Sequence, residues 1–404
     1  MFEPKHGLGW NDLARGADMR IAKLAVSVAV LGFMAGPLPA ADGDDEALEQ
    51  FQEIIRGIDA RSFETTQKAI DRTDMRNRVL SARQIEADVA QVFDTNFWQF
   101  VESGFSSNLP PAGSKLTIDL VDFAFQDGEG KAAVRFSKPN FEYAYQVFDL
   151  RLDGRERLKI VDWFDSTTGQ LLSAEIAEEL MVQTPTKQST RKTISTENPT
   201  DLQLFQVTEI YKAARDRQPP RFFEIYDEFA EPLKREPYIA KSAVFMAYML
   251  QDSNRLIPAL DIFLYVFSDQ PNYALALSDF YLAMGAYEES YAQLKRFQAN
   301  FPVNEGALPA KLSALALATG KFDEAEQFAV EATVDEPTLE LGWWSLLRAR
   351  SSMENYAGTT EALTQLEDNF GQRLDEAKLR RDKFRGFIQL VESQEFKDWR
   401  ASRP

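Results

Sequence analysis

Carboxylates are the main candidates for acid–base chemistry in this sequence. The 404 residues contain no cysteine and a single histidine, His6. Thiol nucleophiles and disulfides are therefore excluded, and the usual zinc ligands and histidine bases are missing beyond that one position. We expect no metal and no cofactor. A catalytic role would need a carboxylate in a desolvated cleft, where burial raises its pKa.

Six carboxylates occur in stretches with strand character, and aromatic residues of the same region could line a pocket beside them. The acids are Asp119, Asp122, Glu142, Asp149, Asp162 and Asp165. The aromatic candidates are Phe97, Trp98, Phe123, Phe125, Tyr143, Tyr145 and Trp163. Strand alternation predicts that Asp119 shares a face with Phe123 and that Asp122 faces the other way. Two interpretations stay open, a ligand pocket with a catalytic acid or a plain aromatic core with solvated acids, and we favour the core.

These residues belong to a predicted α+β domain, residues 46–180. Apolar residues at helical spacing begin near Asp44, Ser62 and Ser81. Period-2 stretches rich in β-branched and aromatic residues follow. They are Leu116–Phe125, Lys131–Phe136, Phe141–Leu152 and Arg155–Phe164. We predict helices packed on one face of an antiparallel sheet of about four strands.

The turns of this domain carry their own signals. Asp127–Gly130 and Lys138–Asn140 are turn-like, and Asp153–Gly154 predicts a two-residue hairpin turn. With this element order and the strand Leu158–Phe164, the domain resembles the nuclear-transport-factor-2-like and cystatin-like folds. That resemblance implies a pocket in the concavity of the sheet.

A second pattern recurs between Tyr238 and Phe370. Small residues of the second helix of each predicted hairpin, Ala259, Ser290, Ala325 and Thr359, are spaced by 31, 35 and 34 residues. A period of about 34 residues with small and apolar residues at fixed positions indicates stacked helical hairpins. On these residues the stretch resembles the tetratricopeptide repeat superfamily. The region 201–400 is then an all-α superhelical array, with a degenerate hairpin before the four repeats and a capping helix, about Leu374–Glu392, after them.

The resemblance implies a concave groove lined by the first helix of each hairpin. The groove residues would be Val244, Tyr248, Leu275, Asp279, Leu282, Ala307, Ala310, Ala314, Leu317, Trp344 and Arg348. This set is mostly small and apolar, which suits an amphipathic helix or an extended peptide. It lacks the lysines and asparagines with which chaperone-binding members hold a carboxylate. Packing against neighbouring repeats or the first domain is the alternative role for these residues.

Net charge and the N-terminal residues restrict the class of partner and the location of the protein. The chain has 45 basic and 63 acidic residues, which argues against nucleic acid as a partner. Residues 19–41 combine a basic start, an apolar run Leu24–Ala35 and small residues, which predicts a signal peptide. We interpret residues 1–18 as a mis-assigned upstream start. The chain would be periplasmic or secreted, without a lipid anchor, and membrane-bound only if the signal segment is uncleaved.

These observations lead to two functional hypotheses. Residues 181–200 are polar and punctuated by Pro185 and Pro199, which indicates a linker between two domains. The first hypothesis is a non-enzymatic exported scaffold that binds a protein or peptide in the groove, with cell-envelope assembly as one process it could serve. The alternative is a small-ligand binder or carboxylate-dependent enzyme that uses the aromatic concavity of the first domain.

Overall fold

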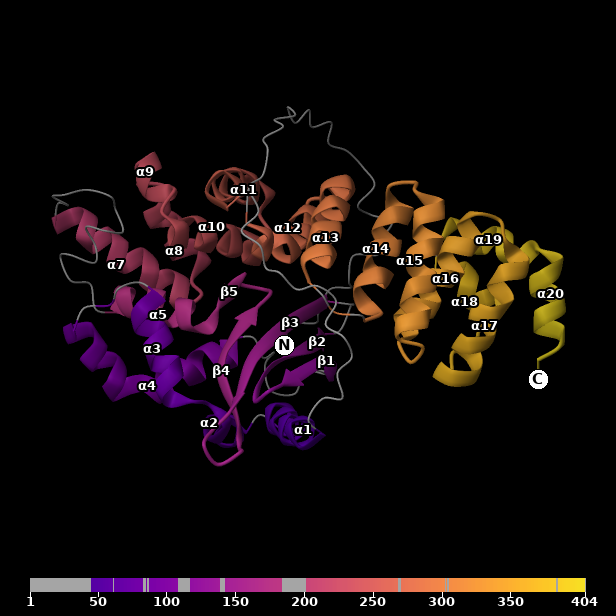
Figure 1. Cartoon of the computed structure of the whole chain (residues 1–404). Coiled ribbons are helices and arrows are strands. Elements are labelled where there is room, and N and C mark those ends of the chain that lie inside the picture. The colour runs from indigo at the N-terminus through magenta and orange to yellow at the C-terminus, as the bar shows by residue number, and fades with distance from the viewer. Residues whose placement is uncertain are drawn as a thin grey trace, which may run out of the picture. The chain divides into compact units, whose positions relative to one another are not determined.

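The computed structural model describes residues 45–60, 62–82, 85, 87–107, 117–138, 142–183, 201–267, 270–301, 303, 305–382 and 384–403. The predicted upstream segment 1–18, the signal peptide 19–41 and residues 184–200 of the predicted linker lie outside these residues. The chain divides into two compact units, and the boundary falls between Ala276 and Leu277. The first unit therefore contains both the sheet region and the first helices of the helical region (Figure 1).

A five-stranded antiparallel meander with strand order β1-β2-β3-β4-β5 forms the centre of the first unit. The strands are β1 (Thr117–Gln126), β2 (Glu129–Lys138), β3 (Glu142–Leu152), β4 (Leu158–Asp165) and β5 (Gln170–Leu171). The prediction of an antiparallel sheet in an α+β arrangement is confirmed. The short β5, which pairs with the end of β4, is the strand that sequence periodicity did not indicate.

A β-bulge in β1 overturns the predicted alternation of that strand. Leu120 pairs with Val134, but Asp122 already pairs with Ala133, so one extra residue is accommodated at Val121. Phe123 and Phe125 therefore pack with Leu120 on the apolar core instead of lying beside Asp119. Asp119 instead pairs with the buried Arg135, with an Nη2–Oδ2 distance of 3.0 Å.

The two Asp–Gly sequences that connect strands form different turns. Asp127 and Gly128 have φ angles of 55° and 83°, and together they make the two-residue connection of β1 to β2. The predicted two-residue turn at Asp153–Gly154 is wrong. There the loop runs from Asp153 to Arg157, with Glu156 at φ 57°, because the Asp153 carboxylate accepts the backbone N–H groups of Arg155 and Arg157 at 2.8 and 3.1 Å.

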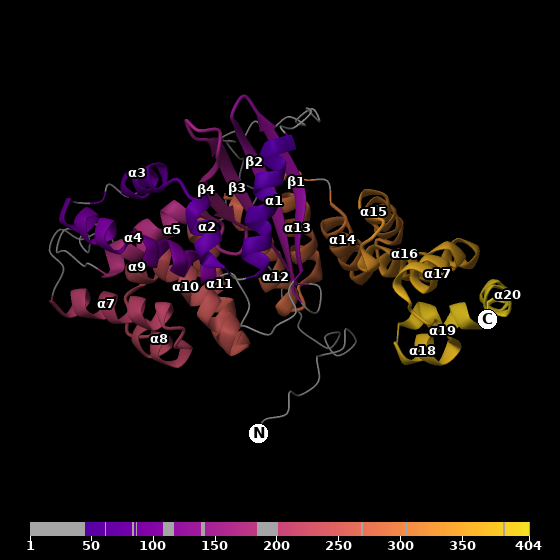
Figure 2. The same ribbon diagram turned by 90° about the horizontal axis from the view of Figure 1, so that it is seen from below.

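Helices of the N-terminal region cover one face of the sheet, and α1 lies across it (Figure 2). They are α1 (Asp45–Asp59), α2 (Phe63–Ala69), α3 (Arg72–Ala82) and α4 (Ala87–Ser107), joined after the sheet by α5 (Leu172–Gln183). The predicted second helical region is split at Ile70, which forms a parallel bridge with Ile160. Asp71 then caps α3 by accepting the N–H groups of Thr73 and Asp74, each at 3.0 Å.

Helices are the only regular secondary structure in the described chain after residue 200. The bounds are α7 (Asp201–Arg215), α8 (Pro219–Tyr226), α9 (Glu231–Lys234), α10 (Pro237–Leu250), α11 (Ser253–Phe267), η1 (Pro271–Tyr273), α12 (Ala274–Ala283), α13 (Tyr287–Asn300), α14 (Ala307–Ala318), α15 (Phe322–Asp335), α16 (Glu340–Ser352), α17 (Tyr356–Phe370), α18 (Glu376–Arg381), α19 (Arg385–Glu392) and α20 (Gln394–Ala401). A helical C-terminal region is thus confirmed. We find no helix among the described residues with the length and apolarity to span a bilayer.

Four helical hairpins, α10–α11, α12–α13, α14–α15 and α16–α17, turn in the same way. A residue with positive φ stands two positions before each second helix, namely Gln251, Gly285, Gly320 and Glu354. These residues are 34, 35 and 34 positions apart (285−251, 320−285, 354−320). The backbone therefore repeats with the period that the sequence indicates.

Small buried residues stand where the two helices of a hairpin face each other. Ser278 and Ser290 are fully buried, and their hydroxyl oxygens are 3.1 Å apart. Ser313 on α14 and Ala325 on α15 are likewise fully buried. A larger side chain at these positions would push the helices apart.

The C-terminus continues the stacking. The predicted single capping helix is two helices, α18 and α19, and α20 packs on α17. Trp399 donates its indole N–H to Thr364 at 3.0 Å, and Arg400 pairs with Glu367 at 2.9 Å. These offsets of 35 and 33 residues match the offset of 33 that joins Gln298 of α13 to Glu331 of α15. α20 thus takes the place of one more second helix.

Candidate functional site

The predicted groove residues differ widely in exposure. Val244, Leu275, Ala307 and Ala310 are buried, with 0–2% of their surface exposed. Tyr248 is 39% exposed, while the other six are half-buried: Asp279, Leu282, Ala314, Leu317, Trp344 and Arg348. A partner could reach the half-buried residues directly, whereas the four buried ones already serve as packing.

Charged and polar residues on the first helices of the second unit form ion pairs and hydrogen bonds. Lys311 donates to Asp279, and Arg348 pairs with Asp382 at 3.3 Å. Trp344 donates its indole N–H to Glu340 at 3.0 Å, and the Arg348 guanidinium lies 5.6 Å from its ring centroid. The apolar groups beside these pairs, Leu282, Ala314 and Leu317, are left half-open to solvent.

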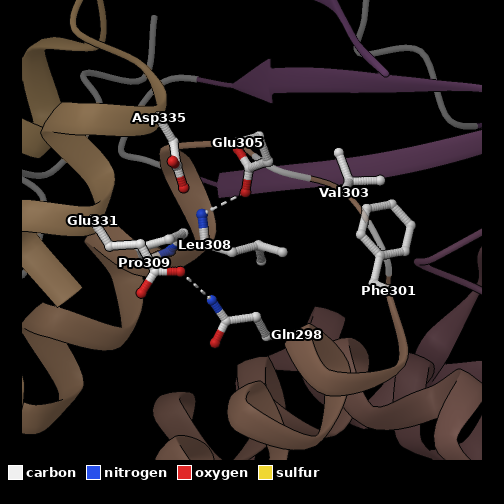
Figure 3. Close-up of a pocket in the computed structure, with 8 residues that line it drawn as sticks. All are labelled: Gln298, Phe301, Val303, Glu305, Leu308, Pro309, Glu331 and Asp335. Atoms are coloured by element: carbon white, nitrogen blue, oxygen red, sulfur yellow. Dashed lines mark hydrogen bonds between the residues drawn. The ribbon is translucent and has the colours of Figure 1, made fainter. Parts of the chain in front are cut away.

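A cavity of about 160 Å³ lies within the second unit (Figure 3). Its walls come from the end of α13, the connection to α14, the first turn of α14 and the end of α15. The lining residues are Gln298, Phe301, Val303, Glu305, Leu308, Pro309, Glu331 and Asp335. Half of this lining is apolar and three of the eight residues are acidic, and none of the eight was among the predicted site residues.

The local structure explains how the acids of this cavity are held. Glu305 caps α14 by accepting the N–H groups of Ala307 and Leu308 at 2.8 and 2.6 Å. Glu331 accepts from the amide of Gln298 at 3.1 Å. Partial burial raises the pKa of Glu331, and the charge of Asp335, one helical turn away, raises it further. Burial also raises the pKa of Asp335.

A buried polar cluster joins the sheet region to α10 inside the first unit. Lys241 is the only charged residue of α10, and its ammonium donates to Gln170 at 2.7 Å and to Glu178 of α5 at 3.1 Å. Glu178 is 5% exposed and Lys241 is 8% exposed. Near by, Gly169 at φ 68° packs against the ring of Tyr273. This ion pair ties the two sides of the predicted linker together.

Two more carboxylates belong to the cluster. Asp165 is buried and accepts from the backbone N–H of Thr167 at 2.7 Å and from Gln146 at 3.1 Å. Burial raises the pKa of Asp165, and it raises the pKa of Glu175 to about 8, although the charge of Lys241 opposes the shift. Burial alone would lower the pKa of Lys241, but the charges of Glu178 and Glu175 raise it above its ordinary value.

The aromatic side chains that were predicted to line a pocket are buried or partly buried in the protein interior. Phe97, Phe125, Tyr143, Tyr145 and Trp163 are buried. Phe123 and Trp98 are partly buried against the apolar core, where the Phe97 and Trp98 rings meet edge to face with centroids 4.8 Å apart. The core interpretation of this region therefore describes these side chains.

The strand carboxylates are dispersed rather than gathered at one point. Asp149 pairs with Lys131 at 3.0 Å, and Asp119 pairs with Arg135. Asp162 is buried and accepts from the Ser173 hydroxyl at 2.6 Å and from the Ser173 N–H at 3.2 Å, so it caps α5. Burial raises the pKa of Asp162 and of the half-buried Asp122. The side chain of Glu142 lies outside the described residues.

The described residues contain no group of three or more His, Asp or Glu side chains placed to hold a metal ion. The sequence matches no known protein-family model, and comparison with curated proteins gives no match either.

Proposed function

We propose that this protein is a non-enzymatic scaffold of the tetratricopeptide type that binds a protein or peptide segment. The repeated placement of a positive-φ residue two positions before each second helix is the observation that carries the proposal. Arrays of identical hairpins expose one helix of each pair along an extended surface, and such surfaces serve as binding faces. The buried small residues at the helix contacts support the same assignment.

The binding face of the second unit is the row of first helices α12, α14 and α16. Leu282, Ala314 and Leu317 present half-buried apolar surface there, and Trp344 adds an aromatic anchor. Paired charges such as Asp279–Lys311 border that surface. An amphipathic helix or an extended segment with alternating apolar residues suits this combination, because apolar anchors provide the affinity and bordering polar groups set the register.

Export belongs to the same proposal. A basic start, an apolar run and small residues at 19–41 are the features that support a cleaved signal peptide. The purified mature protein would then begin near Ala41 or Asp42. Mass spectrometry of its N-terminus tests this, since a peptide that includes any of residues 1–18 contradicts both the cleavage and the later start.

Affinity capture with three matched baits tests the binding face. The baits are the wild-type chain, the groove variant Leu282→Glu/Leu317→Glu, and the control Ala292→Glu/Ala299→Glu on the exposed side of α13. We expect a partner that the wild type and the control retain and the groove variant loses, since a carboxylate on the apolar surface would be desolvated without a cation. Equal retention by all three baits would refute the face, and capture of no partner by the wild type would refute the scaffold.

A further inference from the structure

The cavity of the second unit, called the α15 cavity from here on, has two carboxylates without a cationic partner in the described part of the chain. Within the described residues no lysine or arginine pairs with Glu331 or Asp335, whereas Glu324 of the same helix pairs with Lys295 and Glu288 of α13 pairs with Lys321. Among the described residues, the hydrogen bond to Glu331 comes from the neutral amide of Gln298. The cavity thus holds two acceptors one helical turn apart, and the apolar residues of its lining are Phe301, Val303, Leu308 and Pro309.

The walls and the size of this cavity restrict what it can hold. Leu308 and Phe301 are almost completely buried and form the apolar side, with Pro309 next to the acids. A volume of about 160 Å³ is below the roughly 300–1,000 Å³ of pockets for drug-sized ligands, so one extended side chain is the fitting occupant. An apolar stem with a cationic head matches walls of this kind, because lysine and arginine bury the stem and keep the head at the polar rim.

The surface beside the cavity points to a macromolecule as the source of that side chain. Val330 and Val334 of α15 are 38% and 70% exposed, and they precede Glu331 and Asp335 by one residue each. An apolar strip therefore runs along the acidic one on the same helix. A protein segment with a basic residue next to apolar ones would cover both.

We propose that the α15 cavity binds the lysine or arginine side chain of a partner protein, with the cation between Glu331 and Asp335 and the stem against Leu308. This second contact site rests on the proposed scaffold function, because it supplies the partner. It adds a chemical requirement that the apolar groove does not: the partner carries a basic residue outside its groove-binding segment.

Nuclear magnetic resonance with minimal probes tests the cavity independently of any partner. The probes are N-acetyl-arginine amide and N-acetyl-lysine amide, with N-acetyl-citrulline amide and N-acetyl-norleucine amide as neutral counterparts. The side-chain amide of Gln298, assigned with the variant Gln298→Glu, reports on Glu331. We expect a saturable shift of this signal with both cationic probes and none with the neutral pair. Equal shifts with charged and neutral probes, or no shift, would overturn the proposal.

Two variants separate the cavity from general attraction to an acidic protein. Glu331→Gln/Asp335→Asn is expected to weaken the cationic probes about tenfold or more, as loss of hydrogen bonds to charged groups does. Asp323→Asn/Glu395→Gln removes the same charge from exposed sites elsewhere in the second unit and is expected to leave binding unchanged. Equal weakening by both variants would overturn the proposal.

The probes also keep this proposal separate from the scaffold function. Binding of the cationic probes together with no captured partner would refute the scaffold and leave only the affinity of the cavity for cationic side chains. A captured partner that the variant Glu331→Gln/Asp335→Asn retains with unchanged affinity would overturn the cavity's role and retain the scaffold.

Discussion

At the residue scale, the protonation of Glu175 depends on the folded state. Its Oε1 atom is buried and has no hydrogen-bond partner in the described part of the chain. Burial is the main cause that raises its pKa from 4.5 to about 8, and the charges of Asp165 and Glu178 add to it. The unfolded chain releases the proton of the Glu175 carboxyl above the ordinary pKa of that group. The folded protein keeps this proton to a higher pH.

The sign of the pH dependence follows from that difference. Between the unfolded pKa of 4.5 and the folded pKa of about 8, the folded state binds more protons, so stability falls as pH rises. The slope is at most about 1.4 kcal/mol per pH unit. We expect Glu175→Gln to flatten this part of the profile and to raise the melting temperature at pH 8 to 9. Parallel melting profiles of variant and wild type from pH 5 to 9 would contradict the assignment.

The pair Lys241–Glu178 gives a second prediction. Lys241→Met leaves Glu178 buried without its cation, and breaking a buried pair in this way costs about 3–5 kcal/mol. Lys241→Met/Glu178→Leu removes both charges and should recover most of that loss in urea unfolding. If the double variant is no more stable than the single one, the two groups do not act as a pair.

Lys241 shows which features of the buried cluster could be predicted from the sequence. A single lysine in the otherwise uncharged run Pro237–Leu250 is an anomaly that predicts a buried ionic partner. The identity of that partner could not be predicted, because Glu178 is 63 residues away and α5 carries three acids, Glu175, Glu178 and Glu179. Gln298, Glu331 and Asp335 carried no such signal, since acids on an exposed helix face are ordinary.

At the element scale, the turn of each hairpin uses the same backbone conformation with different residues. Gly285 and Gly320 adopt positive φ without a steric penalty, but Gln251 and Glu354 hold the same place at φ 53° and 57°. We expect Glu354→Gly to stabilise the protein by about 1 kcal/mol and Gly320→Ala to destabilise it by a similar amount. A Cβ at Gly320 meets no atom within 4 Å, so the cost is conformational alone. Thermal melts of both variants check the opposite signs.

Helix packing within a hairpin gives a further prediction. Ala325 of α15 is fully buried against α14, so Ala325→Phe should cost at least the 1–3 kcal/mol that is typical of overpacking. Ala299→Phe on the exposed side of α13 is the control and should be nearly neutral. Equal melting temperatures for the two variants would contradict the register of the hairpins.

Secondary-structure elements could be predicted where a local sequence pattern is sufficient to determine them. The hairpins follow from the period of small residues, and the type of the N-terminal sheet follows from period-2 patterning. The bulge at Val121 was not predictable, because it depends on pairing with β2, and it reverses which residues face the core. The prediction of a two-residue turn after β3 was wrong for a related reason. The Asp153 side chain binds the loop backbone, and this contact overrides the local preference of the Asp–Gly sequence.

At the scale of the whole molecule, the first compact unit runs across the predicted linker. Helix α5 contacts α7, and the ion pair of Glu178 and Lys241 joins residues on either side of 184–200. Sequence composition shows where a chain is polar, but it does not show which buried side chains hold the flanking parts together. The polar stretch could therefore be recognised in the sequence, whereas the ion pair could not.

Cleavage of that stretch provides the molecular-scale prediction. A protease site placed within residues 184–200 should yield two fragments that stay associated in size-exclusion chromatography, because their interface contains buried apolar and ionic contacts. The same cut in the variant Lys241→Met should release them more readily, as measured by dilution. Immediate separation of the wild-type fragments would contradict a single unit from 36 to 276.

The hydrogen bonds at offsets of 33 and 35 residues have an evolutionary consequence. Gln298 reaches Glu331 across one repeat, and Trp399 reaches Thr364 across another, so each layer is bonded to the next by residues at equivalent heights. Duplication or loss of one whole hairpin preserves these hydrogen bonds between the hairpins that remain. An insertion of a few residues inside a helix instead shifts one partner of each bond and breaks it. Chains of this design are therefore expected to differ from one another in the number of layers rather than in the length of their helices.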